Sequence, residues 1–200
     1  MRLLRRIGWR GAVVAGVLLV AVATAIAAPR LGATRAHARI ASAPAPLSTT
    51  SLQARFAYLR TQHSNQCGMP ASALSAMAPS ARLQGSCCFP MNYAAYVKQR
   101  HDIRRYADVS VVPQDPYDVS VGLAQRLTSY GSINLTPTEQ RVYDRAKPLS
   151  ETKGPCCCPC WRWTAFAGQA KYLITRRHYT ARQIANVWSV EEGCGGPGGS

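Results

Sequence analysis

Four of the eight cysteines of this chain fall within five positions, between Cys156 and Cys160. Consecutive cysteines cannot all be bridged to one another, because a disulfide places its two Cα atoms about 5.5 Å apart and neighbouring Cα atoms lie about 3.8 Å apart. Their partners must therefore come from other parts of the chain or be a soft metal ion. The remaining cysteines, which are the available protein partners, are Cys67, Cys87, Cys88 and Cys194.

Thiolates bind metals and attack disulfides, and the cysteines of this chain fall in predicted loops or at predicted helix ends. Helix N-termini favour the thiolate, and Lys153 and Arg162 add positive charge near the main cluster. Clustered thiolates suit Cu(I), zinc or an iron–sulfur centre. His63 and Met69, which flank Cys67, are weaker candidates, since solvated histidines and packed methionines are more common. The predicted metal ligands are therefore Cys156, Cys157, Cys158, Cys160, Cys87, Cys88, Cys67 and Cys194.

Disulfide bonds and thiol redox chemistry are the alternatives to metal binding. An even number of cysteines in an exported chain is typical of disulfides, here up to four, which would staple a structural or partner-binding module. The clustering argues against that use alone, because bridges constrain a chain most when they are spread out. A mixed scheme, with Cys67 bridged to Cys194 and the other cysteines holding an ion, also fits. The third alternative is a redox protein that uses the vicinal cysteines.

The sequence lacks the motifs of common enzymes and of nucleic-acid-binding proteins. It has no Gly-rich phosphate loop, no Gly-x-Ser-x-Gly turn and no His-Glu-x-x-His helix, so we assign no catalytic residue and leave enzymatic activity undecided. The formal net charge is +15, and no acidic residue precedes Asp102. Because the basic residues are not interleaved with stacking aromatic residues, we predict no nucleic-acid partner.

The N-terminal residues have the composition of an export leader. Met1–Arg10 carries four arginines, and residues 11–28 are uncharged and mostly Ala, Val, Leu and Ile. We predict that residues 1–28 are a signal peptide or a single transmembrane anchor, with residues 11–28 in the membrane. The rest of the chain would then lie at the extracytoplasmic face of the cell membrane, or be secreted or periplasmic after cleavage, with an unidentified envelope protein as its partner. Residues 29–50, rich in Ala, Pro, Ser and Thr, predict a flexible tether.

Apolar residues at helical spacing predict the first helices of the folded part. They indicate helices over residues 51–62 and 91–107, with a short helical turn over 71–77, and the second helix is expected to start directly behind the Cys87-Cys88 pair. Asp115-Pro116 has the form of a cap followed by proline at the first helical position, and predicts a helix from there to Gly131. The Val109–Val112 run is the only β-branched run and is short.

Two capping boxes and one amphipathic pattern predict the remaining helices. Thr136 with Glu139 indicates a helix that ends at Ala146, where Lys147-Pro148 should stop it. A helix opening at Pro159 would bury Trp163, Phe166, Ala167, Ala170, Leu173 and Ile174 and expose Arg162, Gln169, Lys171 and Arg176. The second capping box begins a helix at Thr180 that ends near Cys194.

These elements predict an all-α fold, namely an irregular bundle of five to seven short helices with Cys-bearing loops. The Cys-rich helical domain would span residues 51–194, after the leader and tether, with a disordered tail at 195–200. We expect an exported or membrane-anchored protein that binds a soft metal ion, in order to store, deliver or sense it. This hypothesis requires that Cys87 and Cys88 lie beside the Cys156–Cys160 stretch.

Overall fold

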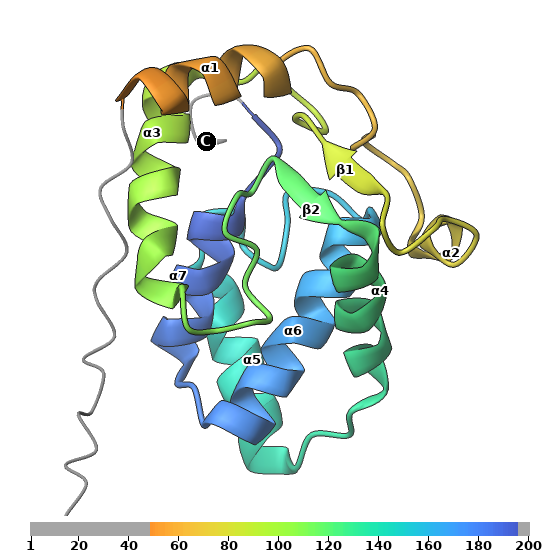
Figure 1. Cartoon of the computed structure of the whole chain (residues 1–200). Coiled ribbons are helices and arrows are strands. Elements are labelled where there is room, and N and C mark those ends of the chain that lie inside the picture. Colours follow the sequence, from red (N-terminus) through yellow and green to blue (C-terminus); the bar gives the residue numbers. More distant parts are fainter. Residues whose placement is uncertain (1–48, 196–200) are drawn as a thin grey trace, which may run out of the picture. The chain divides into compact units, whose positions relative to one another are not determined.

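The computed structural model describes residues 49–195, which are mostly helical (Figure 1). The α-helices are α1 (Thr49–Leu59), α2 (Ala71–Leu74), α3 (Tyr93–Asp102), α4 (Val121–Ser129), α5 (Pro137–Leu149), α6 (Trp161–Arg177) and α7 (Ala181–Glu191). Two 3-10 helices, η1 (Ile103–Tyr106) and η2 (Tyr130–Ser132), follow α3 and α4. The predicted leader at 1–28, the tether up to residue 48 and the tail at 196–200 lie outside the described residues, so these stay predictions.

The described residues also contain a short sheet, so the all-α prediction holds only in its coarser form of a mostly helical fold. Strands β1 (Arg82–Gln84) and β2 (Asp118–Ser120) pair in antiparallel register, with Leu83 opposite Val119. The Val109–Val112 run does not form a strand, and its valines are instead buried in a loop. Among residues 49–195, we find no helix whose length and apolar character would suffice to cross a bilayer.

Helix α6 runs through the middle of the helical part and packs against α2, α4, α5 and α7 (Figure 1). Its predicted apolar residues Phe166, Ala170, Leu173 and Ile174 are buried. The prediction was wrong for Arg162 and Gln169, which were expected to face solvent and are fully buried. Because neighbouring elements cover α6 on several sides, a helical residue at these positions has no route to water.

The close approach of α4 to α6 depends on a glycine. A Cβ atom built on Gly168 would lie 2.1 Å from the carbonyl oxygen of Leu127, closer than atoms can approach. Leu127 and Phe166 are both buried in the main hydrophobic core at this crossing. The absence of a side chain at position 168 therefore sets the distance between the two helices.

The capping boxes at Thr136 and Thr180 are both present, with each cap accepting from the amide three residues on. Helix α5 nevertheless continues to Leu149, past the predicted end at Ala146. Pro148 is tolerated because it lies in the last turn, where its missing amide removes only one helical hydrogen bond. The amide of Ser150 bonds the carbonyl of Ala146 at 3.2 Å and closes the helix.

Three predicted helix starts were wrong. Helix α6 begins at Trp161, with Cys160 at the N-cap position, rather than at Pro159. Helix α3 begins at Tyr93 behind the cap Asn92, rather than directly behind the Cys87-Cys88 pair. Helix α4 begins at Val121, with Ser120 as its cap, rather than at Pro116. At α3 and α4 the residue before the observed start has a side chain that accepts a hydrogen bond from the amide three residues later, and this cap fixes the start better than the upstream proline does.

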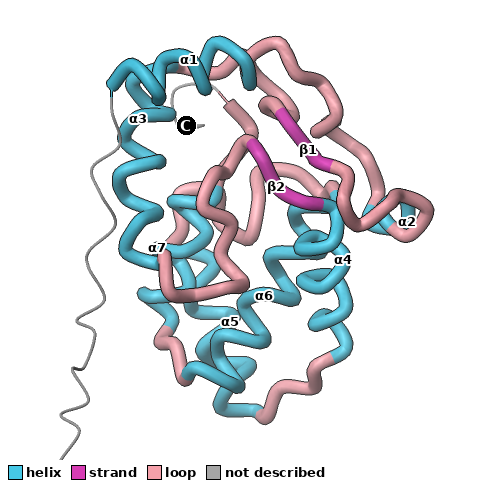
Figure 2. The backbone as a smooth tube through the Cα atoms, viewed as in Figure 1, coloured by secondary structure: helices cyan, strands magenta, loops and turns pink. Residues whose placement is uncertain are grey.

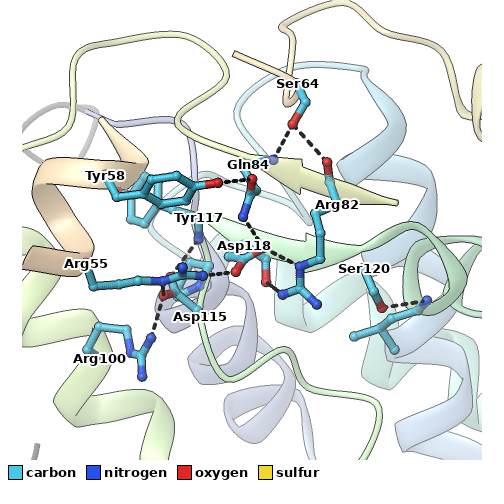
Figure 3. Close-up of polar contacts among 12 residues, drawn as sticks. Arg55, Tyr58, Ser64, Arg82, Gln84, Arg100, Asp115, Tyr117, Asp118 and Ser120 are labelled. Atoms are coloured by element: carbon cyan, nitrogen blue, oxygen red, sulfur yellow. Dashed lines mark hydrogen bonds and ion pairs between the residues drawn. The ribbon is translucent and has the colours of Figure 1, made fainter. Parts of the chain in front are cut away.

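Asp115, which was expected to cap α4, forms ion pairs with arginines instead (Figure 3). Asp115 accepts from Arg100 Nη1 at 2.5 Å and from the buried hydroxyl of Tyr96 at 3.0 Å. Asp118 pairs with Arg82 at 2.6 Å and with Arg55 of α1. These ion pairs tie α1, α3 and the two strands together next to the loops that carry cysteines.

Candidate metal centre

The structure brings all eight cysteine sulfurs into one connected group, although they come from four separate segments. Cys67 follows α1, Cys87 and Cys88 follow β1, and Cys194 follows α7. The fourth segment, Cys156–Cys160, joins α5 to α6. The hypothesis required that Cys87 and Cys88 lie beside this stretch. The Sγ atom of Cys88 is 3.9 Å from that of Cys158, and the thiol of Cys87 contacts that of Cys160. All eight cysteines lie outside the helices and strands, and none forms a disulfide. Figure 2 draws the loops of the described residues in pink.

Backbone hydrogen bonds hold the four loops against one another. The amide of Cys67 donates to the carbonyl of Cys87 at 3.0 Å, and the amide of Cys88 donates to that of Cys194 at 3.1 Å. The amide of Trp161 donates to Met69 at 2.8 Å, which ties the Cys67 loop to the start of α6. The sulfurs are therefore gathered by main-chain contacts that need no bound ion.

Two glycines allow these loops to approach each other. Gly195 has φ +79°, and a Cβ atom there would lie 2.0 Å from the carbonyl oxygen of Phe89. Gly85 has φ +88°, and a Cβ atom there would lie 1.9 Å from the carbonyl oxygen of Gln62. At both positions an L side chain would be strained and would push apart the loops that carry cysteines.

The sulfur–sulfur distances run from 2.9 Å, for Cys157–Cys194, to 4.0 Å, and the longer ones equal those between ligands of one metal ion. They are 3.1 Å for Cys67–Cys88, 3.3 Å for Cys87–Cys194, 3.5 Å for Cys87–Cys88, 3.5 Å for Cys156–Cys194, 3.8 Å for Cys67–Cys158 and 4.0 Å for Cys156–Cys160. Thiolates around one ion at a metal–sulfur distance of about 2.3 Å lie about 3.8 Å apart in a tetrahedron and about 4.0 Å apart in a triangle. Ions could therefore be bound with small side-chain movements.

Four groups of three sulfurs lie within 4.8 Å of one another, and each could hold an ion. They are Cys67, Cys88 and Cys158 (triad 1); Cys87, Cys88 and Cys194 (triad 2); Cys156, Cys157 and Cys194 (triad 3); and Cys156, Cys158 and Cys160 (triad 4). All the ligand atoms are cysteine sulfurs, and no histidine or carboxylate among residues 49–195 joins these groups.

The cluster is buried on one side and open on the other. Cys87, Cys156, Cys160 and Cys194 are buried, and Trp163 packs against them. Cys67 and Cys157 are exposed at the surface. Trp163 was predicted to be buried; it is half-buried, and it packs against the cysteines.

Two pockets are lined by thiols, and Phe89 lines both of them. A pocket of about 340 Å³ is lined by Cys87, Cys88, His63 and Met91 among others, and one of about 220 Å³ by Cys157, Cys194 and Lys153 among others. Phe89 is 57% exposed. Phe89 and Met91 were not predicted to line the site, and the only sequence signal for Phe89 is its position directly after Cys88.

The α6 N-terminus favours a thiolate at Cys160, which occupies the N-cap position. Hydrogen bonds from the Cys156 and Cys87 thiols lower the pKa of Cys160 well below its usual value, and the amides of Trp163 and Arg162 act in the same direction. The pKa of Cys156 is raised, because its proton is shared with Cys160 and because it also contacts Cys194 and is buried. Negative charge is thus stabilised at the helix end while neighbouring thiols keep their protons.

Comparisons of the chain with protein-family models, with curated proteins and with solved structures found no match, so its chemistry is argued from its own residues.

Proposed function

We propose that this protein binds soft metal ions through its clustered thiolates. The observation that supports this most directly is that eight free cysteines from four chain segments form four triads with the spacing of metal ligands. A disulfide framework needs cysteines in pairs, whereas here one sulfur, Cys194, lies within 3.5 Å of three others: Cys87, Cys156 and Cys157. Such shared contacts are expected of bridging thiolates.

The ligand set favours soft ions. Magnesium, calcium and manganese prefer oxygen ligands, and the triads contain only sulfur. Thiolates select Cu(I), zinc and iron–sulfur clusters. An iron–sulfur centre is the least favoured of the three, because its core of iron and sulfide must lie between cysteines that here contact each other directly.

The mixed exposure of the sulfurs favours a protein that exchanges its ion over one that only uses it to hold the fold. Structural metal sites are normally closed, whereas Cys67 and Cys157 reach the surface and two pockets lead to the other thiols. The proposed role is storage, delivery or sensing of the ion. If the predicted leader anchors or exports the chain, this role is carried out at the extracytoplasmic face of the membrane.

The test is to count metals and thiols on the same sample. The full-length chain is purified with detergent in the absence of both oxygen and added reductant, and its mass is measured under native and denaturing conditions with thiol alkylation. The proposal expects bound zinc or copper and eight alkylatable thiols after the metal is removed. The variant His101→Ala, which loses a metal-capable side chain away from the triads, should retain the same metal content. Eight oxidised cysteines without metal would leave only the disulfide-stapled module.

A thiol redox role is the second candidate, because two sulfur pairs are closer than the others. Cys157 and Cys194 are 2.9 Å apart, and Cys67 and Cys88 are 3.1 Å apart. Each pair contains one exposed cysteine, which could react with an external disulfide. A reduction potential below about −300 mV would mark these pairs as structural bridges rather than redox centres.

A further inference from the structure

The four triads form a closed ring. Triads 1 and 2 share Cys88, triads 2 and 3 share Cys194, triads 3 and 4 share Cys156, and triads 4 and 1 share Cys158. Each triad therefore has two shared sulfurs and one sulfur of its own. The unshared sulfurs are Cys67, Cys87, Cys157 and Cys160.

The number of sulfur–metal bonds that this ring can make determines how many ions it can hold and how many ligands each ion has. If each unshared sulfur makes one bond and each shared sulfur makes two, the eight sulfurs supply twelve bonds, which is three for each of four ions. Bridging thiolates are chemically ordinary, since a thiolate sulfur has more than one lone pair. No sulfur is left over and no ion lacks a ligand.

A site with three thiolate ligands distinguishes zinc from Cu(I), because the two ions prefer different coordination numbers. Structural zinc sites are almost always tetrahedral with four protein ligands, so four zinc ions in this ring would each lack one ligand. Cu(I) has a filled d shell, is soft and monovalent, and accepts three thiolates without a fourth ligand. The ring thus matches the coordination number of Cu(I) better than that of zinc.

The surroundings offset part of the charge of such a cluster. Eight thiolates and four monovalent ions leave four negative charges. The guanidinium of Arg162 is fully buried and adjoins the backbone beside Cys194, since a Cβ atom on Gly193 would lie 2.6 Å from it. Lys153 lines the pocket that contains Cys157, and Cys160 lies at the positive end of α6.

Building on the proposed metal binding, we infer that this ring of triads holds a tetranuclear Cu(I) cluster, with one ion in each triad and Cys88, Cys156, Cys158 and Cys194 as the bridges. Binding replaces the thiol protons with Cu(I), so no electron is transferred. Triads 1 and 3, which stand opposite each other in the ring, contain the exposed Cys67 and Cys157. Their two ions exchange with solvent faster than those of triads 2 and 4, whose unshared sulfurs are buried.

The experiment titrates the reduced, metal-free full-length chain with Cu(I) in the absence of oxygen, in detergent and with a competing Cu(I) chelator. Native mass spectrometry is expected to show four copper ions per chain at saturation, and X-ray absorption to show three sulfurs per copper together with copper–copper scattering. A chelator chase should remove two ions quickly and two slowly. Saturation at one or two ions, or copper without copper neighbours, would overturn the tetranuclear ring while leaving metal binding intact.

Cysteine-to-serine variants test which sulfurs bridge two ions, because loss of a shared sulfur should remove more copper than loss of an unshared one. Cys157→Ser removes the unshared ligand of triad 3 and is expected to bind three ions, whereas Cys194→Ser breaks triads 2 and 3 and is expected to bind two. His101→Ala should bind four. Equal losses in the two cysteine variants would contradict the bridging assignment, and saturation of the wild-type chain by two zinc ions that copper cannot displace would favour two zinc sites instead. No metal uptake by eight reduced thiols would refute the proposed function itself.

Discussion

The buried guanidinium of Arg162 donates a hydrogen bond from Nη1 to the backbone carbonyl of Glu191, at 3.3 Å. It also donates to the carbonyl of Pro116, and its charge lies over the rings of Trp161 and Phe166, with centroid distances of 4.9 and 5.6 Å. One side chain at the start of α6 therefore binds the end of α7 and the loop before β2. Cys194 lies three residues after Glu191, so this contact also positions one bridge of the proposed cluster.

Replacing Arg162 with Met should destabilise the apo protein by about 3 kcal/mol, because two buried carbonyls would lose their donor and the cation contacts to the rings would disappear. Urea unfolding of the reduced protein measures this change. Arg162→Lys keeps the charge and loses the second donor nitrogen, and it should recover only part of the stability. If the Met variant were as stable as the wild type, Arg162 would not be the link between α6 and α7.

The α4–α6 crossing provides a prediction with an internal control. Gly168→Ala would place a methyl group 2.1 Å from the Leu127 carbonyl and should cost roughly 1–3 kcal/mol through overpacking. At Gly131 the added Cβ would meet nothing within 4 Å, so Gly131→Ala should change the unfolding free energy by less than about 0.5 kcal/mol. Thermal unfolding of both variants measures this difference. Equal melting temperatures would contradict the conclusion that α4 and α6 are too close for a side chain at position 168.

Local sequence signals predicted those parts of the fold that depend on neighbours in the chain. The capping boxes at Thr136 and Thr180 work within one helical turn, so the sequence alone was enough to find both helix starts. Strands β1 and β2 were not predictable, because Arg82–Gln84 contains one apolar residue and is stabilised by pairing with residues far along the chain. The burial of Arg162 likewise depends on carbonyls of distant loops.

The gathering of the sulfurs could be expected from the sequence, but their arrangement could not. Clustering in the sequence pointed to Cys87, Cys88 and the Cys156–Cys160 stretch, and Cys67 and Cys194 were included as the remaining cysteines. Which sulfurs share a triad depends on contacts such as the Cys67 amide with the Cys87 carbonyl and the Cys88 amide with the Cys194 carbonyl, at 3.0 and 3.1 Å. These contacts join loops separated by up to about a hundred residues, and no local pattern encodes them.

Glu191 should make the stability of the protein depend on pH. Its side chain is fully buried, and burial raises the pKa of Glu191 well above its usual value, although the Gln169 amide donates to Oε1 at 2.5 Å. Its other oxygen, Oε2, has no hydrogen-bond partner. Because the folded-state pKa is above the unfolded one, the folded protein holds a proton that the unfolded chain releases. The associated stability is fully present below the unfolded pKa and is lost as the pH rises through the folded pKa.

Glu191→Gln should therefore be more stable than the wild type at pH 8 by on the order of 1–2 kcal/mol, since an amide can keep the contact with Gln169 without ionising. The difference should shrink towards about pH 3, below the ordinary pKa of a glutamate, because there the wild-type carboxyl is protonated in both the folded and the unfolded state. Urea midpoints of the two reduced, metal-free proteins at several pH values measure it. A difference that is constant with pH would show that Glu191 does not titrate on unfolding.

The glycine after Cys194 should control the cluster more than the fold. Gly195→Ala adds a methyl group that would lie 2.0 Å from the Phe89 carbonyl at φ +79°, so the Cys194 loop must move away from the Cys87-Cys88 loop. We expect a loss of stability of about 1–3 kcal/mol and at least a tenfold weaker retention of metal against a chelator.

Gly68→Ala is the matched control, because Gly68 has the same φ of +79° but nothing within 4 Å of an added Cβ. The control variant should show the backbone strain, roughly 1 kcal/mol, with metal retention close to that of the wild type. If both variants lost metal equally, backbone strain rather than loop separation would be the cause, and the contact between Phe89 and Gly195 would not hold the sulfurs together.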